Sequence, residues 1–267
     1  MASRILSLIL FALLTVTTAG HTGQTASPDF NPPAELEIER TWTLIVQGNS
    51  VGVIRGTTRV EDIGGRPFIR QQFGGVVGVR PGVSLNTRET LWVGPNGMER
   101  FAARFQETGS TDVSTMKARL EDDILSFDLT MKEGDPVYTD SFIKDLDYHW
   151  STAYIDLDRQ DFKENQPFSK KILDIYALES REVNGVYLGV ETVEQGGHTL
   201  ECRKVKFDYG EVKGIMWLAK DEFGWFLVKE EAETHGQPFE MYLDEYTRKT
   251  ASNAPAAPAK KSTDFRF

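Results

Sequence analysis

The chain has a single cysteine, Cys202, among its 267 residues, so it cannot form an internal disulfide. Its four histidines are scattered, and none has the spacing of a zinc site. It contains no Gly-x-Ser-x-Gly sequence and no glycine-rich loop that ends in Lys-Ser/Thr. We therefore expect a fold that stands on its hydrophobic core, with no metal, no cofactor and no catalytic residue.

The chain also lacks the run of ~20 apolar residues that a membrane-spanning helix needs. Its longest apolar run, Ile5–Leu14, follows Arg4 and precedes small residues, with Thr17 and Ala19 suited to a cleavage site. A membrane anchor is the competing interpretation, but the run is too short for it. The pattern predicts a secretory signal peptide, residues 1–19, export to the periplasm and a mature chain without a transmembrane span.

Basic residues are in the minority, since 30 Lys and Arg stand against 40 Asp and Glu, giving a net charge of −10. Nucleic acids and anionic lipid headgroups select basic surfaces. The composition therefore argues against nucleic acid as a partner and is consistent with a soluble protein.

What the sequence has in abundance is period-two alternation of apolar and polar residues, which is typical of β-strands. The alternation is clearest in 124–132 and recurs in 38–46, 101–106 and 239–246. Glycine-containing turns separate these segments, and the glycine-rich stretch 74–82 is interpreted as a hairpin rather than a phosphate loop. The Asn-Gly pairs Asn96-Gly97 and Asn184-Gly185 predict tight hairpins. The expected fold is mainly β, a meandering antiparallel sheet.

One segment departs from this period. In residues 142–157 the apolar side chains recur at helical spacing, which predicts an amphipathic helix between two blocks of strands. Residues 20–33 are assigned to a flexible N-terminal segment, 34–248 to the β domain, and 249–267 to a disordered Ala/Pro-rich tail.

The hairpin expected in residues 213–232 is apolar on both faces, so both faces must be covered. The rest of a curled sheet can cover one face; a helix, a packed loop or a bound apolar molecule can cover the other. Aromatic residues are the candidates for the wall of an apolar ligand cavity. The predicted ligand-binding residues are Trp42, Trp150, Tyr154, Trp217, Trp225 and Phe226. The alternative is that they complete a packed core.

Cys202 shares strand parity with Leu200, whereas Val205 and Phe207 take the other phase. A β-bulge near Arg203 or Lys204 would reconcile the two phases. We predict that Cys202 is a small buried residue and not a nucleophile.

The stretch from Phe142 to Tyr246 resembles a family of uncharacterised bacterial exported proteins related in fold to the lipoprotein-localisation factors LolA and LolB. The motif Trp217-Leu218-Ala219-Lys220-Asp221 is the most specific match, followed by "VKEEAETHG" at 228–236. The stretch "DEFGWF" departs from the family, whose members tend to have a proline-containing turn there. The resemblance implies an incomplete β-barrel, a strongly curved antiparallel sheet with a helix over its concave side. In the carriers, that side accepts lipid acyl chains.

Three functions remain open. The leading hypothesis is non-catalytic binding of a lipid or other apolar cargo, or a role in envelope lipid or lipoprotein handling. The alternative is an envelope assembly or protein-interaction module with a fully packed core, and the third is an enzyme acting on an envelope polymer. The terminal "STDFRF" predicts a weak contact with an envelope protein, because an apolar C-terminal residue with a free carboxylate can add to a partner's sheet edge.

Overall fold

The computed structural model describes residues 30–80, 82–94, 97–121, 124–132, 134–143, 148–150, 163–174, 179–210, 212–234 and 236–250. The predicted signal peptide, residues 20–29 and tail residues 251–267 lie outside these ranges. The described strands are β1 (Leu36–Val46), β2 (Asn49–Ile63), β3 (Arg66–Arg80), β4 (Val83–Gly94), β5 (Gly97–Glu107), β6 (Val113–Glu121), β7 (Ile124–Thr130), β8 (Tyr138–Ile143), β9 (Tyr148–Trp150), β10 (Pro167–Asp174), β11 (Glu179–Gln195), β12 (His198–Tyr209), β13 (Val212–Asp221), β14 (Gly224–Thr234) and β15 (Gln237–Thr250).

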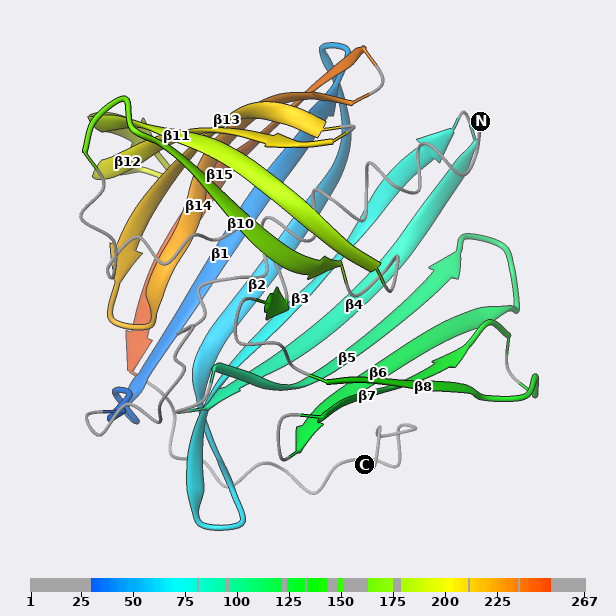
Figure 1. The fold of residues 1–267 in the computed structure, drawn as a ribbon. Coiled ribbons are helices and arrows are strands. Elements are labelled where there is room, and N and C mark those ends of the chain that lie inside the picture. The colour runs from blue at the N-terminus through cyan, green and yellow to red at the C-terminus, as the bar shows by residue number, and fades with distance from the viewer. Residues whose placement is uncertain are drawn as a thin grey trace.

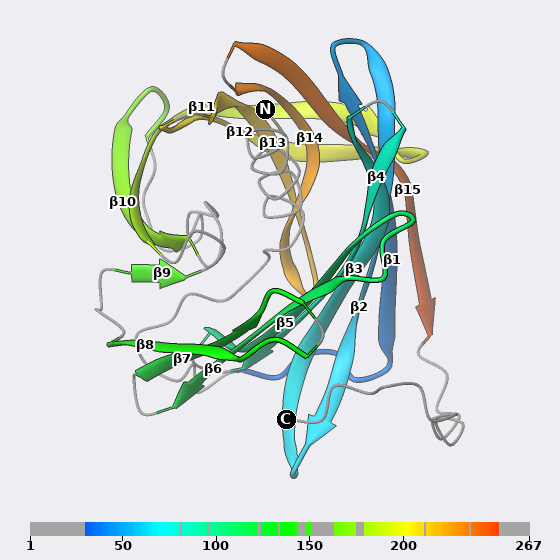
Figure 2. The same cartoon turned by 90° about the vertical axis from the view of Figure 1, so that its right-hand side faces the viewer.

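All these strands form one sheet in the order β8-β7-β6-β5-β4-β3-β2-β1-β15-β14-β13-β12-β11-β10-β9. The first strand pairs with the last, so two meanders extend in opposite directions from the β1–β15 pair. The edge strands β8 and β9 are neighbours in sequence. Figure 2 shows the sheet curling, so that β10–β14 face the other meander across an interior. The predicted mainly β, antiparallel and unclosed sheet is confirmed.

The pairing of β9 with β10 is parallel, whereas every other described pairing is antiparallel. A parallel pair cannot be joined by a two-residue hairpin, and β10 begins well after the end of β9 in the sequence. Figure 1 shows β1, β2 and β3 as long neighbouring strands near the middle of the sheet.

Alternation determines which face each strand buries. In β1 every second residue from Ile38 to Leu44 is buried, as the sequence pattern predicts. Phe239, Met241 and Leu243 of β15 are buried in the same way and lie against β1. The buried side of β1 also includes Arg40, of which only 4% of the surface is exposed to solvent.

Several predicted hairpins are confirmed. Gly94 of β4 pairs with Gly97 of β5, so the chain reverses between them at the predicted Asn-Gly position. The glycine-rich stretch lies in β3 and leads into β4 by a tight turn, as predicted for a hairpin. The hairpin that is apolar on both faces is β13–β14, and its residues 216–219 are all buried.

The other Asn-Gly prediction is wrong, because Asn184 and Gly185 lie inside the long strand β11. Gly185 is paired with Phe168 of β10. A Cβ at Gly185 would stand 2.1 Å from the Phe168 ring. The glycine therefore makes room for an aromatic ring on the next strand instead of making a turn.

The predicted helix over 142–157 is also wrong where the structure describes that range. Phe142 and Ile143 end β8, where they pair with β7, and residues 148–150 form β9. Residues 144–147 and 151–157 lie outside the described residues. Aromatic and β-branched residues favour strands when a partner strand is present. The helical spacing of apolar residues in the sequence gives no information about whether such a partner strand exists. Within the described residues, no helix is long and apolar enough to cross a membrane.

Candidate functional site

The concave face of the sheet is identified by contacts that pass over an intervening strand. The Trp42 indole Nε1 of β1 donates a hydrogen bond to the Leu227 carbonyl of β14 at 2.9 Å, although β15 lies between these strands. The Trp42 ring also packs on Phe73 of β3, with ring centroids 6.1 Å apart, across β2. Side chains two strands apart meet most readily on the inside of a curved sheet, so the buried parity of β1 is concave.

Both meanders contribute to one apolar cluster. Ile54, Phe101 and Phe127 come from the first meander and are each exposed by at most 1%. Val205, Phe207 and other residues come from the second. The rings of Phe73 and Trp42 in this cluster pack directly against the backbone of Gly56. A Cβ at Gly56 would stand within 2.9 Å of both rings.

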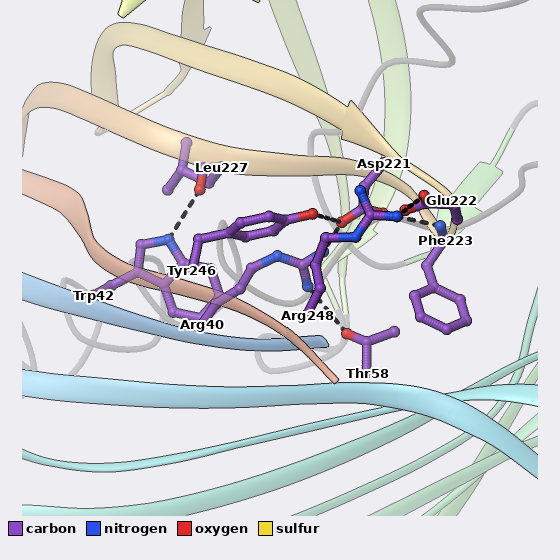
Figure 3. Close-up of polar contacts among 9 residues, drawn as sticks. All are labelled: Arg40, Trp42, Thr58, Asp221, Glu222, Phe223, Leu227, Tyr246 and Arg248. Carbon is purple, nitrogen blue, oxygen red and sulfur yellow. Dashed lines mark hydrogen bonds and ion pairs between the residues drawn. The ribbon is translucent and has the colours of Figure 1, made fainter. Parts of the chain in front are cut away.

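The structure brings together two of the six predicted ligand-binding residues, through shared neighbours. Phe226 stacks on Tyr246, with centroids 5.3 Å apart and planes 9° apart. Trp42 reaches the backbone of Leu227, the residue after Phe226. Trp42 and Phe226 are both buried, and Figure 3 shows Trp42 and Tyr246 close to Arg40.

Trp217 and Trp225, two further predicted site residues, have a different environment. Trp217 lies beneath two ammonium groups, with Lys204 Nζ 4.8 Å and Lys229 Nζ 4.9 Å from its ring centroid. The three residues are directly opposed on β12, β13 and β14. Trp225 is flanked by Arg203 and Lys220. The charged groups of these three lysines and one arginine lie over the two rings in cation–π contacts, so part of this aromatic surface is covered without a ligand.

The remaining predicted residues are not placed in the site. Trp150 belongs to β9, where its backbone is paired with Leu173 of β10. Its side chain, and the whole of Tyr154, lie outside what the structure describes.

A buried ion pair organises the concave face near the β1–β15 pair. The guanidinium of Arg40 is paired with the carboxylate of Asp221, at the end of β13, and their side chains are only 3% and 4% exposed. Arg40 Nη1 donates to the Thr58 hydroxyl at 3.1 Å, and the guanidinium carbon lies 4.4 Å from the centre of the Phe226 ring. Figure 3 shows Arg40 between β1 and the β13–β14 turn.

Asp221 has further partners. Its Oδ1 accepts a hydrogen bond from the Phe223 amide at 2.9 Å, and its Oδ2 accepts one from the Tyr246 hydroxyl at 3.4 Å. Burial, and secondarily the charge of Asp221, raises the pKa of Tyr246 to about 12, so this hydroxyl is a neutral donor at ordinary pH. The pair therefore ties β1 and β2 to the β13–β14 turn and to β15.

The sequence carries one indication of this pair. Arg40 occupies the apolar parity of its strand, where an arginine must find a partner. Nothing local identifies Asp221 as that partner, because it lies far along the chain. Buried carboxylates also occur at Glu89 and Glu230. No group of three or more His, Cys, Asp or Glu side chains suited to a metal ion occurs in the part of the chain that the structure describes.

Cys202 is buried, as predicted. The predicted irregularity is present beside it, because the β11–β12 register shifts opposite Lys204 and Val205. The extra residue, however, is Leu188 of β11 rather than a residue of β12.

Cys202 is expected to react slowly with a thiol-specific reagent in the folded protein at pH 8. Burial, with smaller contributions from Glu191 and Glu201, raises the pKa of its thiol to about 12, and the thiolate is the reactive form. Absorbance detection of the modified thiol should show rapid reaction only after denaturant is added. Equal rates in the folded and denatured protein would contradict the assignment.

No family model and no curated protein matches this chain. Among solved structures it is similar to the crystal structure of a beta-barrel-like protein of domain of unknown function DUF1849 from Brucella abortus. The TM-score is 0.53 at 8% identity, over 80% of this chain and 98% of that chain. At this identity the likeness concerns the fold alone. It agrees with the expectation of a barrel-like fold of the kind found in uncharacterised proteins.

Proposed function

We propose that the protein is an exported, non-catalytic binding protein whose concave apolar face takes an apolar guest, such as a lipid acyl chain, in the cell envelope. The observation that carries the proposal is the number of strands in the curled sheet, together with the apolar side chains on its concave side. An eight-stranded barrel is filled by its own side chains, whereas barrels of about sixteen strands enclose a channel. This sheet has 15 strands, and apolar residues from both meanders line its concave side.

The energetics of such a guest are favourable. Burying an acyl chain contributes about 0.8 kcal/mol per methylene group, so a chain of moderate length gains several kcal/mol. Phe101 of β5 and Phe127 of β7 supply aromatic surface on the two sides of Ala118 of β6, and Leu129 of β7 is only partly buried beside them. The sequence also resembles an uncharacterised family related in fold to the lipoprotein-localisation factors, which is consistent with the same class of cargo.

A specific observation favours a second candidate, an assembly or protein-interaction module with a packed core. Trp42 is exposed by 1%, and Trp217 and Phe226 by 4% each. Side chains this well covered have the burial of an ordinary core. In this case the partner is a protein, and the concave face admits no guest.

Replacing Ala103 with Phe is expected to weaken binding of a fluorescent fatty acid at least several-fold. Ala103 is buried in the apolar cluster, opposite Met116 of β6, so an added ring takes the space of the guest. Titration of probe fluorescence measures the dissociation constant, and circular dichroism checks the fold, because overpacking costs roughly 1–3 kcal/mol.

The matched control is Ser126→Phe, which adds the same ring at an exposed position of β7. Its probe affinity should equal that of the unmodified protein. If the unmodified protein binds no fatty acid, the guest-binding proposal fails and the packed module replaces it.

A further inference from the structure

A groove of about 510 Å³ lies over strands β2 to β5, away from the concave site. Most of its lining side chains have the strand parity opposite to the buried core. At its centre, Gly74 and Gly75 of β3 contribute no side chains. The groove is lined by Arg55, Thr57, Gln72, Phe73, Gly74, Gly75, Asn86, Thr87, Arg88, Arg104 and Gln106.

Three of the lining arginines occupy one row across the sheet. Arg55 is directly opposite Gly74, which is directly opposite Arg88. Arg88 is in turn directly opposite Arg104 of β5. Directly opposed residues project to the same face, so Arg55 and Arg88 flank the space that the missing side chain of Gly74 leaves, and Arg104 lies next to Arg88 on the following strand.

This row is electrostatically costly in the free protein. Like charges directly opposite each other destabilise a sheet, and Arg88 and Arg104 are such a pair. Within the part of the chain that the structure describes, the side chains of Arg55, Arg88 and Arg104 make no ion pair or hydrogen bond. The chain as a whole has a net charge of −10, so acidic partners are in ample supply.

Arginines elsewhere on the same sheet have found such partners. Arg59 is paired with Glu37, Arg66 with Glu99 at 3.2 Å, and Arg119 with Glu121. The contrast indicates that the charge of the arginine row is directed at a ligand and not at the fold.

The rest of the groove offers uncharged hydrogen-bonding groups. Gln72 accepts a hydrogen bond from Arg70 at 3.2 Å through its carbonyl oxygen, which leaves its amide nitrogen as a donor. Asn86 and Thr57 also line the groove. Amides and hydroxyls of this kind suit the hydroxyl groups of a sugar.

We propose that this groove binds a phosphorylated sugar, with the phosphate held by Arg55, Arg88 and Arg104 and the sugar hydroxyls by the neighbouring amide side chains. A phosphate monoester carries about −1.5 to −2 charge and three acceptor oxygens. It can therefore accept hydrogen bonds from several guanidinium groups, whereas a carboxylate is typically paired with one. The volume lies within the range of small-molecule sites, roughly 300–1,000 Å³, and accommodates a disaccharide.

Isothermal titration calorimetry with lactose 1-phosphate, inorganic phosphate, lactose and glucuronate tests the proposal on the full chain. Lactose 1-phosphate should bind more tightly than inorganic phosphate, and lactose alone should not bind. If inorganic phosphate binds as tightly, the sugar assignment is overturned; if glucuronate does, the phosphate assignment is overturned. Absence of binding by every phosphate-bearing probe overturns the whole proposal.

Two variants locate the binding in the groove. Arg88→Ala should weaken lactose 1-phosphate binding roughly 10- to 100-fold, because it removes charge-assisted hydrogen bonds. Arg119→Ala, which removes an equal charge from an exposed pair on β6, should leave it unchanged. Equal losses in the two variants would show a non-specific charge effect and overturn the site. Gly74→Val, which fills the groove without removing charge, should also abolish binding.

Discussion

Replacing Asp221 with Asn is expected to lower the free energy of unfolding by about 3–5 kcal/mol, because it leaves the buried charge of Arg40 without a counter-charge. The amide oxygen can still accept from the Phe223 backbone, but the amide NH2 then faces the Arg40 and Tyr246 donors, so the loss combines the missing charge with these two lost hydrogen bonds. Urea unfolding followed by circular dichroism measures the change.

Two matched variants separate this effect from a general loss of contacts. Glu222→Gln changes the neighbouring but exposed pair with Arg248, and should cost less than about 1 kcal/mol. The double variant Arg40→Leu/Asp221→Leu should recover most of the stability lost in Asp221→Asn, since an apolar pair has no charge to desolvate. If Asp221→Asn costs no more than Glu222→Gln, the ion pair does not hold these strands together.

Replacing Trp42 with Ala is expected to cost about 3–5 kcal/mol, the range for truncating a large buried aromatic residue. The side chain is 1% exposed, packs on Phe73, and donates the hydrogen bond to the Leu227 carbonyl. Differential scanning calorimetry at a single pH should show a lower melting temperature with the same cooperative transition.

Trp42→Phe is the control for this variant, because it keeps a ring in the cluster and removes the indole donor. It should cost about 1–3 kcal/mol, the penalty for leaving a buried acceptor unsatisfied. A loss below 1 kcal/mol for Trp42→Ala would mean that the concave cluster is not a packed core around this residue.

Most of the strands were predictable from the sequence because they carry a local signal of alternating apolar and polar residues. The apolar parity of 38–46 predicted which side of β1 is buried, and the parity of 239–246 did the same for β15. What alternation could not supply was the order of strands. The pairing of the first strand with the last joins residues such as Leu36 and Thr250, and no local pattern encodes that contact.

The two errors of fold share a physical cause. The Asn184-Gly185 pair has the chemistry of a tight turn, but the glycine is needed to admit the Phe168 ring from a neighbouring strand. The spacing of Phe142 and Trp150 fits a helix, but both residues lie in strands that pair with β7 and β10. In each case a tertiary partner overrode a valid local preference.

The candidate sites were predictable to different degrees. Large aromatic residues are visible in a sequence, so Trp42 and Phe226 could be chosen for the concave region. The lysines that cover Trp217 and the arginine row of the outer groove depend on strand register. A shift of one residue in β4 would move Arg88 to the other face, so only the observed pairing with Gly74 and Arg104 reveals the row.

The central claim, that the concave face takes an apolar guest, is tested most directly by native mass spectrometry of the protein purified from its native host without detergent. The account predicts a population heavier than the bare chain, whose excess mass is an apolar molecule released by denaturation in organic solvent. Incubation with a fatty acid should restore the heavier species to protein stripped of its guest. A bare chain before and after incubation would contradict the claim and leave the concave face as a packed core.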